Sequence, residues 1–106
     1  MASGTLIKPF YGIDTANVLV NNIATSWTAT QDCWLVVTLY VGTTNVRGDV
    51  EIDGVTVGTL YYYKGQADTF LLARSEVYPI KAGQTIERQN ATGDISALPF
   101  TVYGIK

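Results

Sequence analysis

Three acidic residues could carry out chemistry in this chain, and they stand two positions apart: Asp49, Glu51 and Asp53. A pair of carboxylates can hydrolyse a glycosidic bond, and carboxylates combined with loop carbonyls can hold calcium. The residues between them, Val50 and Ile52, are aliphatic, and such alternation is also the pattern of a strand with one face in water. The pattern therefore favours a solvated strand face over a catalytic or metal site.

Other catalytic groups are missing from the sequence. The chain contains no histidine, which is the commonest general base and metal ligand. The single cysteine, Cys33, lies in an apolar stretch, where a thiol behaves as a small buried hydrophobic group. No phosphate-binding or dinucleotide-binding glycine pattern occurs. We therefore expect no catalytic residue, no metal site and no cofactor.

Two short motifs have functional interpretations that the rest of the sequence does not strengthen. Arg47-Gly48-Asp49 spells the adhesion tripeptide that integrins bind. A glycine near the start of a strand, however, also fits a bulge or a close approach of another chain segment. Asn90-Ala91-Thr92 has the form of a glycosylation sequon, which matters only in a secreted chain. We interpret both motifs structurally.

The tyrosines indicate a binding surface. Tyr61, Tyr62 and Tyr63 are consecutive, and tyrosine offers a flat apolar ring with a polar tip, which suits sugars and protein interfaces alike. The interpretation that we favour over a ligand site is that Tyr61 and Tyr63 lie in the core or at a subunit interface, with Tyr62 at a partly exposed rim. Four residues near the predicted hairpin and loops are our candidates for ligand contact: Tyr62, Lys64, Arg47 and Asp49.

These residues are carried by short strands. No window has a helical period, and turn residues recur about every eight to twelve positions, which is typical of an all-β sandwich or barrel. The clearest element is a hairpin of strands 46–52 and 55–61 around Asp53-Gly54, a pair that favours a type I′ turn. In its second arm we expect Val55, Val57, Tyr61 and Tyr63 to share one face. Other predicted strands or apolar pieces are 5–11, 17–20, 24–30, 33–41, 69–73, 77–80, 85–88 and 97–105, with loops at 42–45 and 90–94, giving about eight to ten strands.

The strand 33–41 is apolar on both faces. Leu35, Val37, Leu39 and Val41 form an aliphatic face. An antiparallel strand ordinarily turns its second face to water. Here that face is largely apolar too, so we expect another copy of the chain to cover it. The candidate subunit-interface residues are Trp34, Val36, Thr38 and Tyr40.

Size and charge narrow the class of protein. The 106 residues are expected to form one β-sandwich domain, 1–106. The net charge is −2, and the seven basic residues are scattered, which argues against a nucleic-acid surface. No apolar run approaches the about 20 residues of a membrane span, and the first residues show no signal peptide.

Four segments resemble a known family. They are Trp-Thr-Ala-Thr-Gln-Asp-Cys-Trp at 27–34, Val-Glu-Ile-Asp-Gly-Val at 50–55, Val-Tyr-Pro-Ile-Lys-Ala-Gly-Gln-Thr-Ile at 77–86, and the run 100–105. Together they resemble the small jelly-roll head domains of phage and prophage tail-fibre or baseplate proteins of Gram-positive hosts, which are related in shape to trimeric tumour-necrosis-factor and C1q heads. The resemblance covers 24–105. One departure is Cys33, where the family has glycine and where a positive φ would strain cysteine.

The resemblance implies a non-catalytic, homotrimeric jelly-roll head of a phage tail that binds a host cell-wall saccharide. Its partners would be sister subunits and other tail proteins, without nucleic acid or membrane insertion. The chain would occur in the virion, or in the cytoplasm before assembly. One alternative is a structural or decoration protein of the virion that binds no ligand. A less favoured one is a glycan hydrolase that uses Asp49, Glu51 and Asp53.

Overall fold

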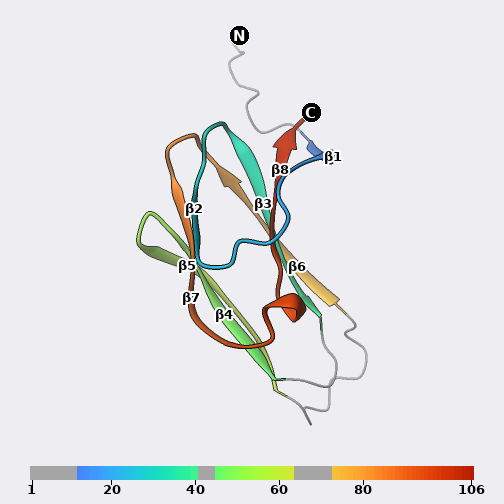
Figure 1. Cartoon of the computed structure of the whole chain (residues 1–106), viewed down its shortest axis with the longest axis vertical. Helices are drawn as coiled ribbons and strands as arrows, with labels where there is room; N and C mark the ends of the chain where they lie inside the picture. Colours follow the sequence, from blue (N-terminus) through green and yellow to red (C-terminus); the bar gives the residue numbers. More distant parts are fainter. Residues whose placement is uncertain (1–11, 41–44, 64–72) are drawn as a thin grey trace.

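The computed structural model describes residues 12–40, 45–63 and 73–106, which form two antiparallel sheets of four strands each (Figure 1). The all-β sandwich expected from the sequence is confirmed. The predicted strand 5–11 and residues 69–72 lie outside the described residues. The elements are β1 Ile13–Val20, β2 Ser26–Thr28, β3 Cys33–Tyr40, β4 Val46–Ile52, β5 Val55–Tyr62, β6 Ala73–Ile80, β7 Thr85–Gly93, the 3₁₀ helix η2 Ile95–Ala97 and β8 Phe100–Ile105.

The strand order is that of a jelly roll. The first sheet has the order β1-β8-β3-β6, and the second has the order β2-β7-β4-β5. The chain passes to the other sheet at every connection between successive strands except the β4–β5 hairpin, so that two Greek keys interlock. The described crossings, such as those from β1 to β2 and from β6 to β7, run over the ends of the sandwich (Figure 1). Residues far apart in sequence are thereby brought onto the same sheet face.

The hairpin between β4 and β5 has the predicted turn but an unexpected bulge. Asp53 has a φ of 52° and Gly54 a φ of 81°, as a type I′ turn requires. Val50 pairs with Gly58 while Glu51 pairs with Thr56, so Val57 has no partner across the hairpin. This extra residue inverts the alternation along β5.

The bulge determines which faces the β5 side chains occupy. Val55 shares the face of Ile52, whereas Tyr61 shares the face of Arg47. The prediction that Val55 and Tyr61 lie on one face is therefore wrong. Val57, at the bulge itself, is 43% exposed.

The strand β7 is longer than the sequence suggested. It continues through residues 90–93, which we expected to be a loop, and pairs with β4 as far as Gly93. A register shift opposite Arg47 and Asp49 accommodates Asn90, which has a φ of 52°. Asparagine tolerates this left-handed conformation better than most residues do. The final strand starts at Phe100 rather than at 97, because η2 occupies Ile95–Ala97.

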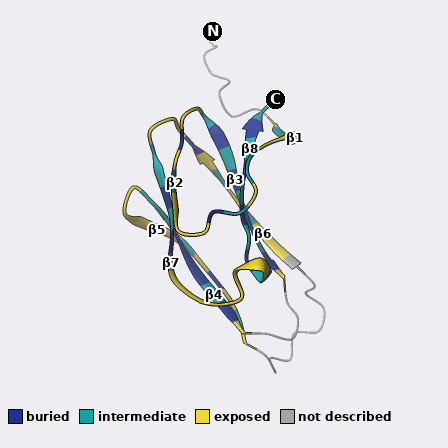
Figure 2. Cartoon of the chain, viewed as in Figure 1, coloured by how far each residue is buried: buried dark blue, intermediate teal, exposed yellow. Residues whose placement is uncertain are grey.

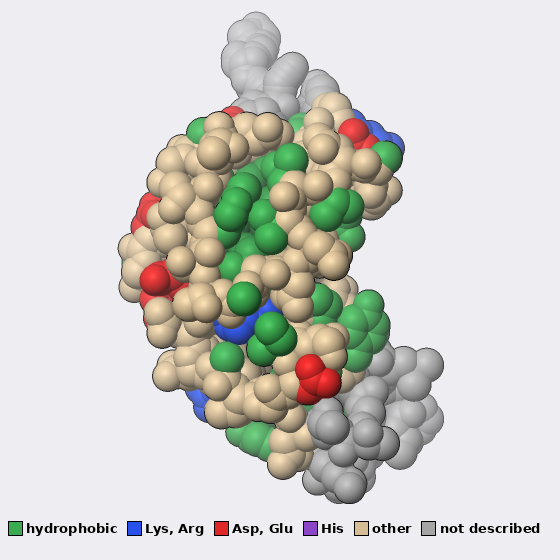
Figure 3. All heavy atoms as spheres, in the orientation of Figure 1, with side chains coloured by type: hydrophobic (Ala, Val, Ile, Leu, Met, Phe, Trp, Pro, Cys, Tyr) green, Lys and Arg blue, Asp and Glu red, His purple; other side chains and the backbone are tan. Residues whose placement is uncertain are grey.

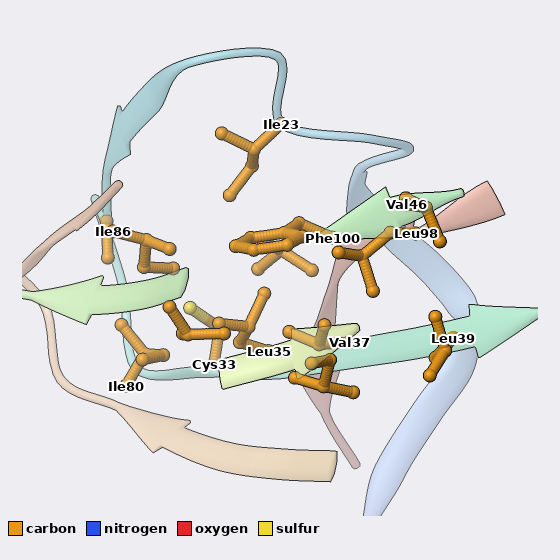
Figure 4. Close-up of a cluster of buried hydrophobic side chains, with 14 residues drawn as sticks. Ile23, Cys33, Leu35, Val37, Leu39, Val46, Ile80, Ile86, Leu98 and Phe100 are labelled. Carbon is orange, nitrogen blue, oxygen red and sulfur yellow. The ribbon is translucent and has the colours of Figure 1, made fainter. Parts of the chain in front are cut away.

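The core lies between the two sheets, and β3 contributes every second residue to it. Leu35, Val37 and Leu39 are almost completely buried, while Tyr40 on the other face is exposed (Figure 2). Figure 4 shows Leu35 and Val37 on one side of the Phe100 ring and Ile23, from the β1–β2 connection, on the other, whereas Leu39 lies farther along β3. The predicted inward face of β3 is confirmed for its described members.

Cys33 fits its strand without strain. It is fully buried, and burial raises the pKa of its thiol to about 11, so the thiol is protonated at neutral pH. In the described residues, the non-glycine positions with positive φ are Asp53 and Asn90. The strain anticipated at Cys33 is therefore absent. The neighbouring Asp32 carboxylate instead accepts a hydrogen bond from the backbone N–H of Ala82, at 2.9 Å, in the turn between β6 and β7.

A buried arginine crosses the core, and the sequence did not reveal it. Arg88 of β7 is 6% exposed. Its Nη1 donates to the Leu98 carbonyl at 2.7 Å, and its Nε and Nη2 donate to the Ile23 carbonyl at 3.1 and 2.9 Å. Nη2 also donates to Asn22 Oδ1 at 2.7 Å, and the guanidinium carbon lies 4.0 Å from the centre of the Phe100 ring. Arg88 thus joins the β1–β2 connection to the segment between η2 and β8.

In residues 12–40, 45–63 and 73–106, no helix is long and apolar enough to span a membrane.

Candidate binding site

The outer faces of the two sheets differ in charge. Among the described residues, the outer face of the second sheet carries Arg47, Asp49, Glu51 and Glu87. The strand registers place no charged residue at the outer positions of the first sheet within the same described ranges. Figure 3 shows acidic side chains at the left-hand margin near β5, whereas the right-hand margin carries hydrophobic side chains with acidic and basic side chains above them. The charged outer positions of the described strands therefore lie on the second sheet.

Asp49 is the centre of a hydrogen-bond network on that face. It lies on β4, between β5 and β7, and is only 5% exposed. Its Oδ2 accepts from Asn90 Nδ2 at 2.6 Å, and its Oδ1 accepts from Thr59 Oγ1 at 2.8 Å. These bonds to Asn90 and Thr59 hold the pKa of the Asp49 carboxyl below its usual value of 3.8. The solvated position that the alternation predicted for Asp49 is therefore wrong, since neighbouring side chains cover it.

We expect the Asp49→Asn variant to be less stable than the parent at pH 7, by about 1–3 kcal/mol, because the donors to a buried carboxylate lose a charged acceptor. A lowered folded-state pKa contributes stability above the unfolded-state pKa, and this contribution disappears as the pH falls through the folded-state pKa. The difference between the two proteins should therefore shrink below about pH 4. Urea unfolding at pH 7 and at about pH 2.5 measures it, with Glu51→Gln as the control. An equal difference at both pH values would contradict this role.

Arg47 lies beside Asp49 and is only loosely bound to it. The distance from Arg47 Nη2 to Asp49 Oδ1 is 3.4 Å, and 39% of the arginine side chain is exposed. Its Nε is buried and has no hydrogen-bond partner in the structure. The strand registers place Arg47 opposite Tyr61 on one side and opposite Thr92 on the other. The exposed part of its guanidinium, rather than the buried Nε, is what a ligand could reach.

Two tyrosines flank Arg47 on the side of β5. Tyr61 is 50% exposed and Tyr63 is 44% exposed. Their ring centres are 5.2 Å apart, and the ring planes are inclined by 37°. Because Tyr61 pairs across the strands with Arg47, the two side chains leave the same sheet face at adjacent positions. Two exposed aromatic rings and a cationic residue thus belong to one part of this face.

A hollow opens on the other side of Arg47. It has a volume of about 510 Å³ and is lined by Arg47, Asn90, Ala91 and Thr92. The bulge in β7 creates it, and the bond from Asn90 to Asp49 holds the bulge in place. The hollow is shallow and open to solvent, so it could contact one side of a ligand without enclosing it. Aromatic rings that could stack on a ligand thus lie on one side of Arg47, and amide and hydroxyl groups that could hydrogen-bond to it lie on the other side.

The four predicted ligand residues do not all lie at one site in the structure. Arg47 and Asp49 come together, as expected of one site. Tyr62 lies partly buried against the core, on the inner side of β5. Lys64 lies outside the described residues. The alternative arrangement, with Tyr61 and Tyr63 in the core and Tyr62 at the rim, is the reverse of what the structure shows.

The three acidic residues each have hydrogen-bond partners of their own. Glu51 accepts a hydrogen bond from Thr56 Oγ1 at 3.4 Å. Asp53, which lies in the hairpin turn, accepts a hydrogen bond through Oδ1 from the backbone N–H of Thr85 on β7, at 2.9 Å. Asp49 is occupied by its own donors. Within the described residues, no group of three histidine, cysteine, aspartate or glutamate side chains could hold a metal ion.

The adhesion tripeptide is part of a central strand rather than a loop. Asp49 is covered, and a Cβ atom at Gly48 would lie 2.8 Å from Leu98 Cδ2. The close approach expected at this glycine is confirmed, and the sheet leaves the tripeptide no accessible conformation for an adhesion receptor.

Comparisons of the chain with models of protein families, with curated proteins and with solved structures gave no match. The resemblance to phage tail heads therefore has no support beyond its four sequence segments.

Proposed function

We propose that this chain is a non-catalytic carbohydrate-binding module whose site is the outer face of the second sheet. The observation that carries the proposal is the pair of exposed tyrosines, Tyr61 and Tyr63, beside the incompletely bonded Arg47 and its hollow. Sugars present apolar C–H faces that stack on aromatic rings, and hydroxyls that need donors and acceptors in fixed positions. Both kinds of group lie side by side here.

Each side chain has a distinct part in this proposal. The rings of Tyr61 and Tyr63 support the apolar face of a pyranose. The Arg47 guanidinium donates to hydroxyl oxygens, while the hydroxyl of Thr92, in the hollow, can donate or accept. Asp49 is a positioning residue, because it holds Asn90 and faces Arg47 without being exposed itself.

Charge favours an uncharged saccharide over an anionic one. The positive charge of Arg47 is offset by Asp49 at 3.4 Å, and Glu51 and Glu87 lie on the same sheet face. A phosphate or carboxylate bound in the hollow would meet these carboxylates, and like charges repel. A neutral polyol would not.

The biological setting rests on the sequence resemblance. We place the module as a homotrimeric head domain of a phage or prophage tail, with a host cell-wall saccharide as its ligand and other tail proteins as partners. The jelly-roll strand order agrees with the fold that the resemblance implies. A hydrolase is less favoured, because Asp49 is only 5% exposed and its two carboxylate oxygens accept hydrogen bonds from Asn90 and Thr59.

Calorimetry with soluble, monovalent oligosaccharides from Gram-positive cell walls tests the proposal. We expect Tyr61→Ala and Arg47→Ala each to weaken binding about tenfold or more, because each removes a stacking surface or a donor group. Tyr40→Ala is the matched control, because Tyr40 is 51% exposed against 50% for Tyr61 but lies on the first sheet. Its affinity should equal that of the parent.

Three outcomes would contradict the proposal. Binding that survives both substitutions would place the site elsewhere. Failure of every wall saccharide to bind would favour a structural protein of the virion. Release of reducing ends from wall polysaccharide would favour a hydrolase.

A further inference from the structure

We infer that the candidate site takes an internal segment of a linear, uncharged polysaccharide, which lies across the strands of the second sheet, rather than the end of a saccharide chain. This inference rests on the proposed function, because it names the part of a saccharide that the same site would hold. Its starting point is the cross-strand row of Tyr61, Arg47 and Thr92, which occupy directly opposed positions on β5, β4 and β7.

The cross-strand row is longer than one sugar unit. Neighbouring strands lie about 4.8 Å apart, so a row that crosses three strands measures about 10 Å from Tyr61 to Thr92. A pyranose ring is about as wide as one strand spacing, and about two or three linked units therefore cover the row. The ring of Tyr63, whose centre is 5.2 Å from that of the Tyr61 ring, enlarges the stacking surface at this end. A single sugar unit would contact only part of these groups.

Both ends of the cross-strand row are open. On one side, β5 is the outermost strand of the second sheet. On the other side, β2 pairs with residues 85–87 of β7, so no described strand lies beyond Thr92. Tyr61 is 50% exposed, and residues 90–93 are exposed as well. A saccharide chain can therefore extend past the row over both edges of the sheet.

The polar groups favour a ligand that runs across the strands rather than along them. Along β4, the next outward side chain after Arg47 is Asp49, which is 5% exposed and already accepts hydrogen bonds through both carboxylate oxygens. The outward position after that is Glu51, a second carboxylate. Across the strands, the row instead presents an aromatic ring, a guanidinium and a hydroxyl in turn, all of them at least partly exposed. These are the groups that stack on or hydrogen-bond to an uncharged sugar.

The hollow beside Arg47 does not enclose the end of a chain. A terminal sugar unit differs from an internal unit chiefly by the free hydroxyl group at its end. A site that selects the terminal unit must therefore surround it, as enclosed pockets surround most of a small ligand. The hollow is lined by Arg47, Asn90, Ala91 and Thr92 and is open to solvent, so these residues contact one side of a ligand only. Such a surface recognises the side of a chain.

The amount of protein bound per gram of polysaccharide separates internal from terminal recognition. The probe is the neutral polysaccharide fraction of Gram-positive cell walls, used intact and after partial acid hydrolysis to half its mean length. Co-sedimentation with the full chain at saturation measures the bound protein. We expect the same amount per gram for both preparations, because cleavage leaves internal segments nearly as abundant as before. A site for chain ends would bind twice as much protein after hydrolysis, because every cut creates new ends.

Substitutions at opposite ends of the cross-strand row test whether the ligand spans it. For a hexasaccharide from the same fraction, we expect Tyr61→Ala to weaken binding about tenfold and Thr92→Val about fivefold, since valine keeps the shape of threonine but lacks its hydroxyl. Calorimetry measures both affinities. Thr56→Val is the matched control for Thr92→Val, because Thr56 is also exposed on this sheet but pairs with Glu51, outside the row. Its affinity should equal that of the parent.

The possible failures of the inference and of the proposed function can be told apart. Twice the bound protein per gram after hydrolysis would overturn the inference while leaving the saccharide site in place. A loss of affinity confined to Tyr61→Ala would do the same, because the ligand would then not reach Thr92 on β7. If neither the intact nor the cleaved polysaccharide bound, the proposed function would be overturned together with the inference.

Discussion

The Arg88→Met variant should unfold with a free energy about 3–5 kcal/mol lower than that of the parent chain, because it removes the guanidinium donors to the buried carbonyls of Ile23 and Leu98 and to Asn22 Oδ1. Methionine replaces the aliphatic stem but offers no donor. The carbonyls of Ile23 and Leu98 and the side-chain oxygen of Asn22 would then face apolar surroundings with fewer bonds. Urea unfolding at pH 7, followed by tryptophan fluorescence, measures the loss.

A second arginine supplies the control for this prediction. The side chain of Arg74 on β6 is 48% exposed, and its nearest ionic partner, Glu76, is 3.8 Å away. Arg74→Met should change the free energy of unfolding by less than about 0.5 kcal/mol, as exposed positions usually do. If the two variants lost similar free energies of unfolding, the hydrogen bonds of Arg88 would stabilise the fold no more than a surface contact does. The proposed role of Arg88 in the core would then be wrong.

Gly93→Ala should lower the free energy of unfolding by about 3 kcal/mol or more. Gly93 has a φ of 80°, and a Cβ atom there would lie 2.0 Å from the Asn45 carbonyl oxygen. The left-handed backbone alone costs a residue with a side chain about 1–2 kcal/mol. The remainder comes from displacing the backbone of Asn45 at the start of β4, where the neighbouring pair Val46 and Gly93 begins the ladder.

Gly54→Ala isolates the conformational part of this effect. Gly54 has a nearly identical φ of 81°, and a Cβ atom there would meet nothing within 4 Å. The free energy of unfolding of Gly54→Ala should therefore fall by only about 1–2 kcal/mol. Thermal and urea unfolding of both variants, side by side, gives the difference. If both variants lost the same free energy of unfolding, the backbone at Asn45 would be shown to move away from the new Cβ atom without destabilising the fold.

Sequence alternation was a good guide where strand pairing is uninterrupted. β3 pairs with β6 in register along its whole length and with β8 without a shift. Its inward residues Leu35, Val37 and Leu39 are therefore those that the pattern predicted. The turn at Asp53-Gly54 was equally predictable, because its backbone conformation depends on the two residues themselves.

The candidate site was only half predictable, because two bulges shape it. Arg47 and Asp49 lie on one strand at spacing two, so their common face could be read from the sequence. The bulge at Val57 brings Tyr61 to the face of Arg47, and the bulge at Asn90 forms the hollow. Both depend on how neighbouring strands pair, and no local propensity encodes such a shift. Residues 90–92 consequently looked like a loop.

Arg88 illustrates a limit of a different kind. In the sequence it is one polar residue among Glu87, Gln89 and Asn90. Its burial depends on acceptors at Asn22 and Ile23, some 65 positions earlier in the chain, which only the folded sandwich brings near. A charged residue in a core requires this kind of long-range compensation, and periodicity contains no information about it.

The position of the candidate site on the second sheet has a consequence for avidity. In the homotrimer proposed above, three Tyr61–Arg47 surfaces, one on the second sheet of each chain, would belong to the same particle. Once one chain holds a polymeric saccharide, the next site encounters the same strand at a high effective concentration. Linked sites of this kind can gain about 10²–10⁴ in overall affinity without any new contact. Repeating glycans would then be retained far longer than any single sugar unit.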